Sequence, residues 1–336
     1  MRVQSSVTSV SWIPSEAVTG LMKLGFASGL SHYDAPPPDL LDSLEVMRDL
    51  DAFRFANRLE VWAEFDGEEI VEHGRGGGLV MGSTTVQLGP LGLTFAGVPM
   101  PDLTPEPEIS SGAVTYRQTC GGRTALPLPR RTPHPPFVRL EAPLVWTTLA
   151  VTVRFDGTTL GRLEGASSFP RHWVYNPDGR LSQKAALTDW ADWTAQPSWT
   201  MTPWGDHDSP PVIAAAEAGL ERLMSKAVMH GRKRPEIRRL AKGTVLTRQG
   251  EEATDLYLLL DGVLALSVNG DDLAELGPGA VVGERALLEG GKRTSTLTAV
   301  TPVRVAVAPS SAIDVTALAT LSRGHHLEDS ETRTNK

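Results

Sequence analysis

Short segments with alternating side chains, separated by glycines, run through residues 243 to 283 and constrain the fold of this chain more than any other feature. Between two of the glycines the side chains fall on two faces: Val263, Ala265 and Ser267 on one, and Leu264, Leu266 and Val268 on the other. A repeat of two residues is that of a β-strand, whose successive side chains point to opposite faces of a sheet. This part of the chain is therefore predicted to be β-structure that turns at its glycines.

An acidic residue and an arginine follow directly, nine positions apart. Glu284 comes after Gly283, and Arg293 precedes Thr294. A guanidinium donates two parallel hydrogen bonds to phosphate oxygens, and a carboxylate accepts a hydrogen bond from a ribose 2′-hydroxyl. Gly283 has no Cβ to keep the backbone away from a ligand. These residue types suit a small molecule with both a hydroxyl and a phosphate, and we expect a cyclic nucleotide.

These residues resemble the phosphate-binding cassette of the cyclic-nucleotide-binding domain, which catabolite activator proteins, cyclic-nucleotide-dependent kinases and gated channels share. The resemblance covers about residues 240 to 313 and extends upstream through four motifs: Lys242-Gly243, Gln249-Gly250-Glu251, Leu256 through Gly262, and Leu276-Gly277-Pro278-Gly279. It implies a jelly-roll-like β-roll. It also implies that Glu284 holds the 2′-hydroxyl, Arg293 the cyclic phosphate, and Thr294 the base or a phosphate oxygen.

The nucleotide-binding residues expected in this segment are Gly283, Glu284, Ala286, Leu287, Arg293 and Thr294. Ala286 and Leu287 would begin a short helical turn and direct free backbone N–H groups at the phosphate. The alternative is a domain that kept the β-roll and lost its ligand, but such domains usually lack the Glu or the Arg. The ligand would be cAMP or cGMP, because the Thr294 hydroxyl can donate or accept a hydrogen bond. No metal is expected.

Residues 1–205 are rich in Gly, Pro and Thr and contain short alternating segments, which predicts a second, β-rich domain built as a sandwich or a barrel. Segments 59–67 and 149–157 share a strand pattern that ends in Phe-Asp-Gly, and Asp-Gly is typical of tight hairpins. The match is explained equally well by an internal duplication, with each half a small sheet, and by chance. Leucines at helical spacing in 39–47 predict a short covering helix, and the proline-rich segment 126–136 is best explained as a stiff connection between sheets.

The end of this domain carries several aromatic residues: Trp173, Trp190, Trp193, Trp199 and Trp204. Core packing is favoured for them over the wall of a pocket. Asp206-His207-Asp208 has metal-binding residue types, but capping of a following helix explains it better. Apolar residues at intervals of three and four predict that amphipathic helix over 210–229.

The expected fold class is mainly β with flanking helices (α+β). Four parts are predicted: a β-rich domain of unknown function (1–205), an amphipathic helix with a basic linker (206–235), a cyclic-nucleotide-binding domain (236–322) and a polar tail (323–336). After Ile313 too little chain follows for the long dimerising helix and helix-turn-helix of catabolite-activator-like regulators. The family helix that covers the base is in doubt for the same reason, so we expect the N-terminal domain or the 210–229 helix to cover it.

Charge and composition narrow the function further. The formal net charge is −8, and DNA binders need clustered Lys and Arg to neutralise phosphates, so we expect no binding to duplex DNA. The basic cluster at 232–242 is interpreted as a solvated linker face. One cysteine, no signal-peptide pattern and no apolar run of membrane-spanning length lead us to expect a cytoplasmic protein without a membrane segment.

Two functions of different class fit these observations. In the first, the β-roll senses a cyclic nucleotide and the N-terminal domain contacts an unknown protein partner. In the second, the N-terminal domain is an enzyme that the nucleotide gates. The enzyme would need a catalytic group, and the one candidate is a Cys120–His172 pair, which the sequence does not bring together. With no phosphate loop, zinc signature, nucleophile elbow or kinase motif in the sequence, we favour the binding protein.

Overall fold

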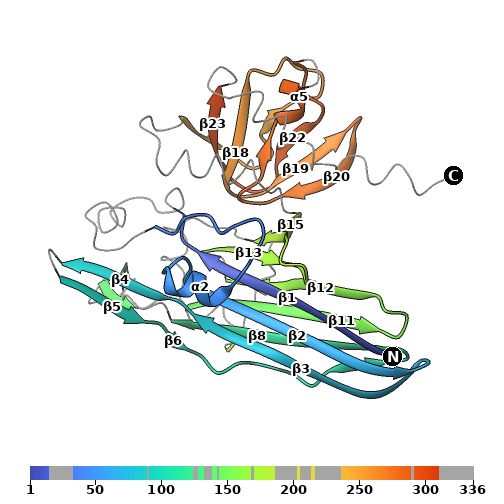
Figure 1. Cartoon of the computed structure of the whole chain (residues 1–336). Coiled ribbons are helices and arrows are strands. Elements are labelled where there is room, and N and C mark those ends of the chain that lie inside the picture. Colours follow the sequence, from blue (N-terminus) through green and yellow to red (C-terminus); the bar gives the residue numbers. More distant parts are fainter. Residues whose placement is uncertain are drawn as a thin grey trace. The chain divides into compact units, whose positions relative to one another are not determined.

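The structure is a computed structural model. It describes residues 1–14, 33–88, 91–123, 128–131, 138–141, 144–167, 170–185, 203–204, 213–215, 236–288 and 291–309. Contacts along the chain divide it into two compact units, Met1–Ile213 and Ala214–Lys336, which Figure 1 shows in the colours of the sequence. The described residues are mostly β-strand, which confirms the predicted fold class.

The N-terminal unit contains two large antiparallel sheets (Figure 1). The six-stranded sheet has the order β15 (Ile213–Ala215), β14 (Leu181–Ala185), β13 (Arg171–Tyr175), β1 (Arg2–Trp12), β2 (Phe55–Asp66) and β3 (Glu69–Met81). The five-stranded sheet has the order β12 (Thr159–Ala166), β11 (Leu144–Arg154), β8 (Ala113–Arg123) and β6 (Val98–Pro99), with β7 (Glu108–Ser110) also beside β8.

Alternate side chains of these strands fill the space between the two sheets. One buried cluster joins them, with members from β1, β2, β8 and β11: Val3, Val7, Leu59, Val61, Ala63, Phe65, Val114, Tyr116, Leu149, Val151 and Val153. Burial of a single Val or Leu side chain is worth about 1.5–3 kcal/mol, so this cluster is the main source of stability of the unit. The two sheets therefore pack face to face as a β-sandwich.

The Asp-Gly turns occur where the sequence predicts them. β2 pairs with β3 across Asp66-Gly67, and β11 pairs with β12 across Asp156-Gly157. The idea that each half of the unit forms its own small sheet is wrong, because β1 lies between β2 and β13, which are far apart in the sequence. β1 therefore has one neighbour from the start of the unit, β2, and one from its end, β13.

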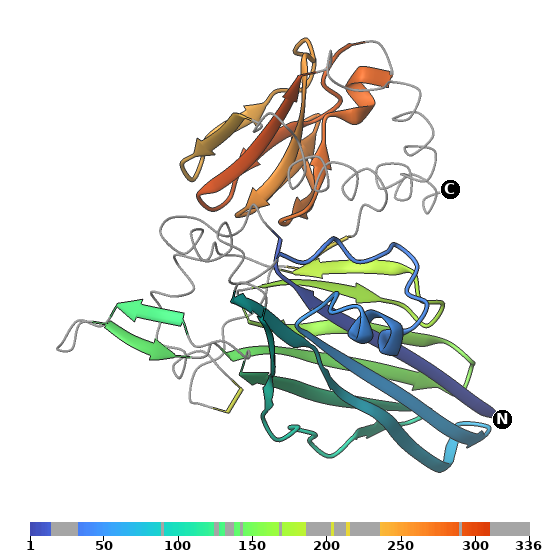
Figure 2. The ribbon, with the colours of Figure 1, turned by 60° about the vertical axis from the view of Figure 1, so that its left-hand side comes forward.

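Two shorter ribbons complete the described strands of this unit. β4 (Ser83–Leu88) pairs with β5 (Leu91–Ala96), and β9 (Leu128–Arg131) pairs with β10 (Val138–Glu141), drawn in green in Figure 2. β9 falls within the proline-rich segment, with Pro129 opposite Leu140. The described part of that segment is thus a strand of a β-ribbon and not a polyproline helix.

The covering helix α2 (Leu44–Asp49) lies on the outer face of the six-stranded sheet in Figures 1 and 2. The Ser43 side chain caps it by accepting a hydrogen bond from the Val46 N–H at 3.3 Å, and it buries Leu44 and Met47. It starts later than the predicted 39–47, because the Asp39 carbonyl accepts a hydrogen bond from the Leu181 N–H at 2.9 Å and so extends the sheet. Among the described residues, no helix is long and apolar enough to cross a membrane.

The predicted helix over 210–229 is wrong at its start. Ile213–Ala215 forms β15 at the edge of the six-stranded sheet, where pairing with β14 satisfies its backbone and the β-branched Ile213 favours an extended strand. The rest of that prediction lies outside the described residues. So do the Asp206-His207-Asp208 motif and the tail after residue 309.

The C-terminal unit contains two four-stranded antiparallel sheets. The first has the order β16 (Glu236–Leu240), β23 (Val303–Pro309), β18 (Asp255–Asp261) and β21 (Val281–Val282). The second has the order β17 (Val245–Thr247), β22 (Thr296–Ala299), β19 (Leu264–Val268) and β20 (Asp271–Leu276). A buried cluster with members from both sheets forms the core, and Leu264 and Leu266 face it, which confirms the predicted alternation. The short helix α5 (Glu284–Leu288) follows β21 closely.

Candidate functional site

Arg293 is a buried cation in the loop before β22. Only 6% of it is exposed. Its Nη2 donates a hydrogen bond to the Asp255 carbonyl oxygen at 2.9 Å, and its guanidinium carbon lies 5.2 Å from the centre of the Tyr257 ring. Its backbone N–H donates to the Glu251 carbonyl at 2.7 Å. Both the chain and the side chain of Arg293 are therefore fixed by the strand β18 and the turn before it.

The Nη1 group of the same guanidinium is buried and has no hydrogen-bond partner among the residues that the structure describes. Gly283 lies directly beside it, with a φ of +97°. A Cβ built on Gly283 would overlap Arg293 Nη1 and approach the Asp255 carbonyl oxygen to 3.2 Å. Position 283 thus requires glycine for both its backbone conformation and its space. The result is a buried cation with one hydrogen-bond donor unused, next to a partly buried glycine.

The helical turn expected after Gly283 is present as α5. Ala286 is 1% exposed, and Leu287 packs against a cluster that includes Leu256 and Leu258. Both side chains are therefore used by the core, so a role in binding would fall to their backbones. Glu284 stands in the first turn of α5, and Thr294 is half-buried next to Arg293.

The structure thus brings Gly283 and Arg293 into contact across a separation of ten residues in the chain. It adds two residues that the sequence did not single out as site residues, Asp255 and Tyr257, both of which hold the guanidinium. The signal for Tyr257 was a tyrosine within an otherwise leucine-rich strand. Asp255 acts through its backbone carbonyl, for which no residue type is a signal.

The Cys120–His172 pair is not formed. The His172 ring is completely buried, and its two nitrogens lie 2.7 Å from Ser11 Oγ and 2.7 Å from the Ser167 carbonyl oxygen. Burial lowers the pKa of His172 to about 4, so the ring is neutral. Burial also raises the pKa of the Cys120 thiol, which keeps it protonated. Both residues are parts of the sandwich core and not a nucleophile with its base.

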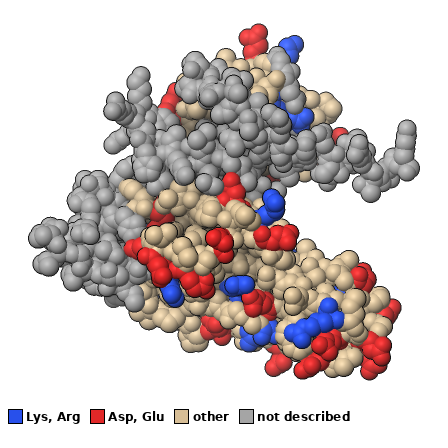
Figure 3. Space-filling view, viewed as in Figure 1, with Lys and Arg blue, Asp and Glu red and all other residues tan. Residues whose placement is uncertain are grey.

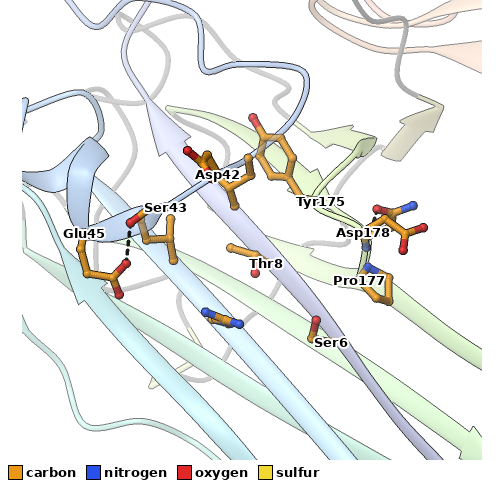
Figure 4. A pocket seen from close by; sticks show the side chains of 13 residues that line it. Ser6, Thr8, Asp42, Ser43, Glu45, Tyr175, Pro177 and Asp178 are labelled. Atoms are coloured by element: carbon orange, nitrogen blue, oxygen red, sulfur yellow. Dashed lines mark hydrogen bonds between the residues drawn. The ribbon is translucent and has the colours of Figure 1, made fainter.

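A groove of about 250 Å³ lies on the outer face of the six-stranded sheet, between the start of α2 and the turn before β14 (Figure 4). Its polar groups are largely bonded within the protein. Glu45 accepts a hydrogen bond from Ser43 Oγ at 2.8 Å, Arg58 pairs with Glu60 at 2.7 Å, and the Tyr175 hydroxyl donates to the Pro38 carbonyl at 2.9 Å. Polar groups that are bonded in this way do not need a ligand to compensate them.

Two observations bear on metals and nucleic acids. No group of three or more His, Cys, Asp or Glu side chains in the described ranges is placed to hold a metal ion. In Figure 3, the described residues of the visible face carry acidic and basic side chains interspersed, and these described residues form no continuous basic surface.

The C-terminal unit is thus a β-roll of two packed sheets, with a buried arginine beside a glycine turn. Residues 237–316 match the family model of the cyclic nucleotide-binding domain. This segment is therefore a cyclic nucleotide-binding domain, attached to a β-rich N-terminal unit. The match supports a cyclic nucleotide as the ligand.

Solved structures similar to this chain cover less than a third of it. The N-terminal domain of a transcriptional regulator from Streptomyces coelicolor A3(2) is 26% identical, covering 27% of this chain and 74% of its own, with a TM-score of 0.25. The regulatory subunit of a cAMP-independent protein kinase A from Trypanosoma brucei is 26% identical, covering 22% and 29%, with a TM-score of 0.21. A cyclic nucleotide-binding-like protein from Brucella abortus is 24% identical, covering 30% and 84%, with a TM-score of 0.23.

Proposed function

We propose that the C-terminal unit binds cAMP or cGMP, with Arg293 on the cyclic phosphate and Glu284 on the ribose 2′-hydroxyl. The observation that carries this proposal is the buried Arg293 guanidinium, whose Nη1 has no hydrogen-bond partner among the described residues. A buried charge is costly unless it is paired and hydrogen-bonded. A phosphate supplies both the negative charge and the acceptor oxygen.

The neighbouring residues support the same ligand. Gly283 keeps the space beside Nη1 free of side chain. A helix leaves the N–H groups of its first turn without an intrahelical partner, and in α5 these include the N–H of Ala286, which suits a phosphate oxygen. Leu287 belongs to the same proposed site. Thr294 would contact the base or a phosphate oxygen, and its hydroxyl accommodates either purine.

The proposed output is regulatory: nucleotide binding changes how the N-terminal unit contacts a protein partner. In the described part of the N-terminal unit, the two candidates for catalysis, Cys120 and His172, are buried, and both ring nitrogens of His172 have partners in the core. This favours a binding role over an enzymatic one. The division into parts 1–205, 206–235, 236–322 and 323–336, and a cytoplasmic location, belong to this proposal.

Titration calorimetry of the full chain with cAMP and cGMP tests the ligand. The wild type should bind at least one of them, and Arg293→Ala should bind at least about thirty-fold more weakly, because the phosphate loses a buried charged partner. Arg239→Ala is the matched control, since it removes an exposed arginine of the same unit. No heat with either nucleotide, or equal binding by Arg293→Ala, would refute the proposal.

Tryptophan fluorescence of the full chain tests the signal between units. All eight tryptophans precede residue 205. A change of emission on addition of the bound nucleotide must therefore come from the N-terminal region, as expected if binding alters its state. Unchanged emission at saturating nucleotide would remove the case for such signalling while leaving binding intact.

A further inference from the structure

Two arginines flank one tyrosine ring in the C-terminal unit. Tyr257 lies on β18 and is 4% exposed. The guanidinium carbon of Arg293 lies 5.2 Å from the centre of its ring, and that of Arg238, on β16, lies 5.9 Å from it. Both distances are within the range of cation–π attraction, about 6 Å. The ring is therefore shared by two cations.

These two cations differ in how their charge is compensated. Arg238 Nε donates a hydrogen bond to the Glu236 carboxylate at 2.8 Å. Among the described residues, the partners of the Arg293 side chain are the Asp255 carbonyl oxygen and the Tyr257 ring, and both of these are neutral. Within the described residues, Arg293 is thus held in place without a carboxylate, and its positive charge stays available.

The Tyr257 ring is well suited to hold a guanidinium at a fixed place. β18 is paired on both sides, with Tyr257 opposite Val282 of β21 and Val307 of β23. The ring also belongs to the buried core cluster of the unit. A carboxylate at this place would hold the arginine more strongly, but it would also compete with an anionic ligand. An aromatic face orients the cation and leaves its hydrogen-bond donors unused.

We propose that Tyr257 is the positioning residue of the anion site: its ring holds the Arg293 guanidinium so that Nη1 faces the space beside Gly283 while the charge stays uncompensated. This inference rests on the proposed cyclic-nucleotide binding. Arg238 contacts the same ring, but Glu236 compensates its charge, so it offers no free charge to a ligand.

The test replaces Tyr257 in the full chain by phenylalanine and then by phenylalanines with one, two and three ring fluorines. Fluorination lowers the negative potential of the ring face and changes its size little. The measured quantity is the affinity for the nucleotide that the wild type binds. Affinity should stay within about threefold for Phe and fall stepwise to about tenfold weaker for the trifluorinated ring, as expected for a cation–π contact. The same series at Tyr116, a core residue of the N-terminal unit, is the control and should leave affinity unchanged.

A second measurement needs no nucleotide. In protein labelled with ¹⁵N-arginine, the Arg293 side-chain resonance, assigned with Arg293→Ala, should show the ring-current shift of Tyr257. The shift should persist in Tyr257→Phe and disappear in Tyr257→Leu. A flat or rising affinity across the fluorinated series, or a resonance that ignores the ring, would overturn the inference. Failure of the wild type to bind either nucleotide would instead refute the proposed function, and the resonance would still decide whether the ring holds Arg293.

Discussion

Arg54 and His172 in the N-terminal unit and Arg293 in the C-terminal unit are all buried, but their surroundings satisfy them differently. In the N-terminal unit, Arg54 pairs with Asp34 at 3.0 Å, with side chains 3% and 0% exposed, and both ring nitrogens of His172 have partners. In the C-terminal unit, Arg293 is buried to a similar degree, yet its Nη1 has no hydrogen-bond partner in the described ranges. A buried polar group with partners stabilises one conformation, whereas an open buried donor indicates a place for a ligand.

The comparison is limited to Arg54, His172 and Arg293 and does not extend to every buried polar atom. The indole N–H groups of Trp12 and Trp173 are also buried without a hydrogen-bond partner. They are neutral, and the two rings contact each other edge to face with centres 5.2 Å apart. An unpaired neutral N–H costs less than an unpaired charge, so these two atoms do not imply a ligand.

The strongest test of the N-terminal half of the comparison is the replacement Asp34→Ala. It should lower the free energy of unfolding by about 3–5 kcal/mol, because it leaves the buried Arg54 without this carboxylate. Denaturant unfolding followed by tryptophan fluorescence reports on this unit, since all tryptophans precede residue 205. The double replacement of Asp34 by Leu and Arg54 by Met should recover part of the loss. A loss below about 1 kcal/mol for Asp34→Ala would show that the pair is not a structural anchor.

A pH titration tests the burial of His172. Its pKa is lowered from 6.5 to about 4 in the folded protein, so the unfolded chain takes up a proton first as the pH falls. The contribution to stability is complete above about pH 6.5 and is lost progressively toward pH 4, by up to roughly 3 kcal/mol. The difference in unfolding free energy between wild type and His172→Gln should therefore change within this window. A constant difference between pH 4 and 7 would contradict a buried neutral histidine.

Two glycine replacements in the C-terminal unit distinguish the effect of a clash with Arg293 from the effect of backbone strain. Gly283→Ala and the control Gly243→Ala both place alanine at positive φ, +97° and +82°, which should cost each about 1–2 kcal/mol. Only the Cβ at position 283 overlaps Arg293, whereas nothing lies within 4 Å of the one at 243. Nucleotide affinity, measured by calorimetry, should thus fall about tenfold or more for Gly283→Ala alone. Equal affinities for the two variants would show that the space beside Arg293 is not used.

The smallest effect is expected for an exposed ion pair. Arg2 and Glu64 lie 3.5 Å apart with side chains 53% and 41% exposed. Solvent screens such a pair, and Glu64→Gln should change the unfolding free energy by less than about 0.5 kcal/mol. A change comparable to that of Asp34→Ala would mean that burial does not separate structural from incidental charges in this unit.

The alternating segments and motifs of the C-terminal unit predicted its fold, because its strands and turns are determined by residues close together in the sequence. The alternation in 263–268 and the glycines before and after β18 fix strands and turns within short distances in the sequence. The same motif placed Gly283 and Arg293 at one ligand site, but their direct contact was not predicted. The sequence did not reveal the support of Arg293 by Tyr257, because an aromatic face and a backbone carbonyl have no required spacing from the arginine.

The N-terminal unit was predicted less completely, for a physical reason. Its hairpins are local and were found from their Asp-Gly turns. The pairing of β1 with β13 joins residues more than 150 positions apart, and no local pattern specifies such a partner. The strand at Ile213–Ala215 was missed because three residues with helical periodicity can still form an edge strand once a neighbouring strand is available. The roles of Glu284, Ala286, Leu287 and Thr294 in binding stay predictions.

The pairing of β16 with β23 makes the C-terminal unit suitable for insertion into another protein. Glu236 stands opposite Val307, so the first and last described strands of the unit lie next to each other and run in opposite directions. A segment whose two ends are adjacent can be inserted into a surface loop of another protein with little stretching of the host backbone. By this geometry, residues 236–309 can be joined to a host protein at two neighbouring points of its surface.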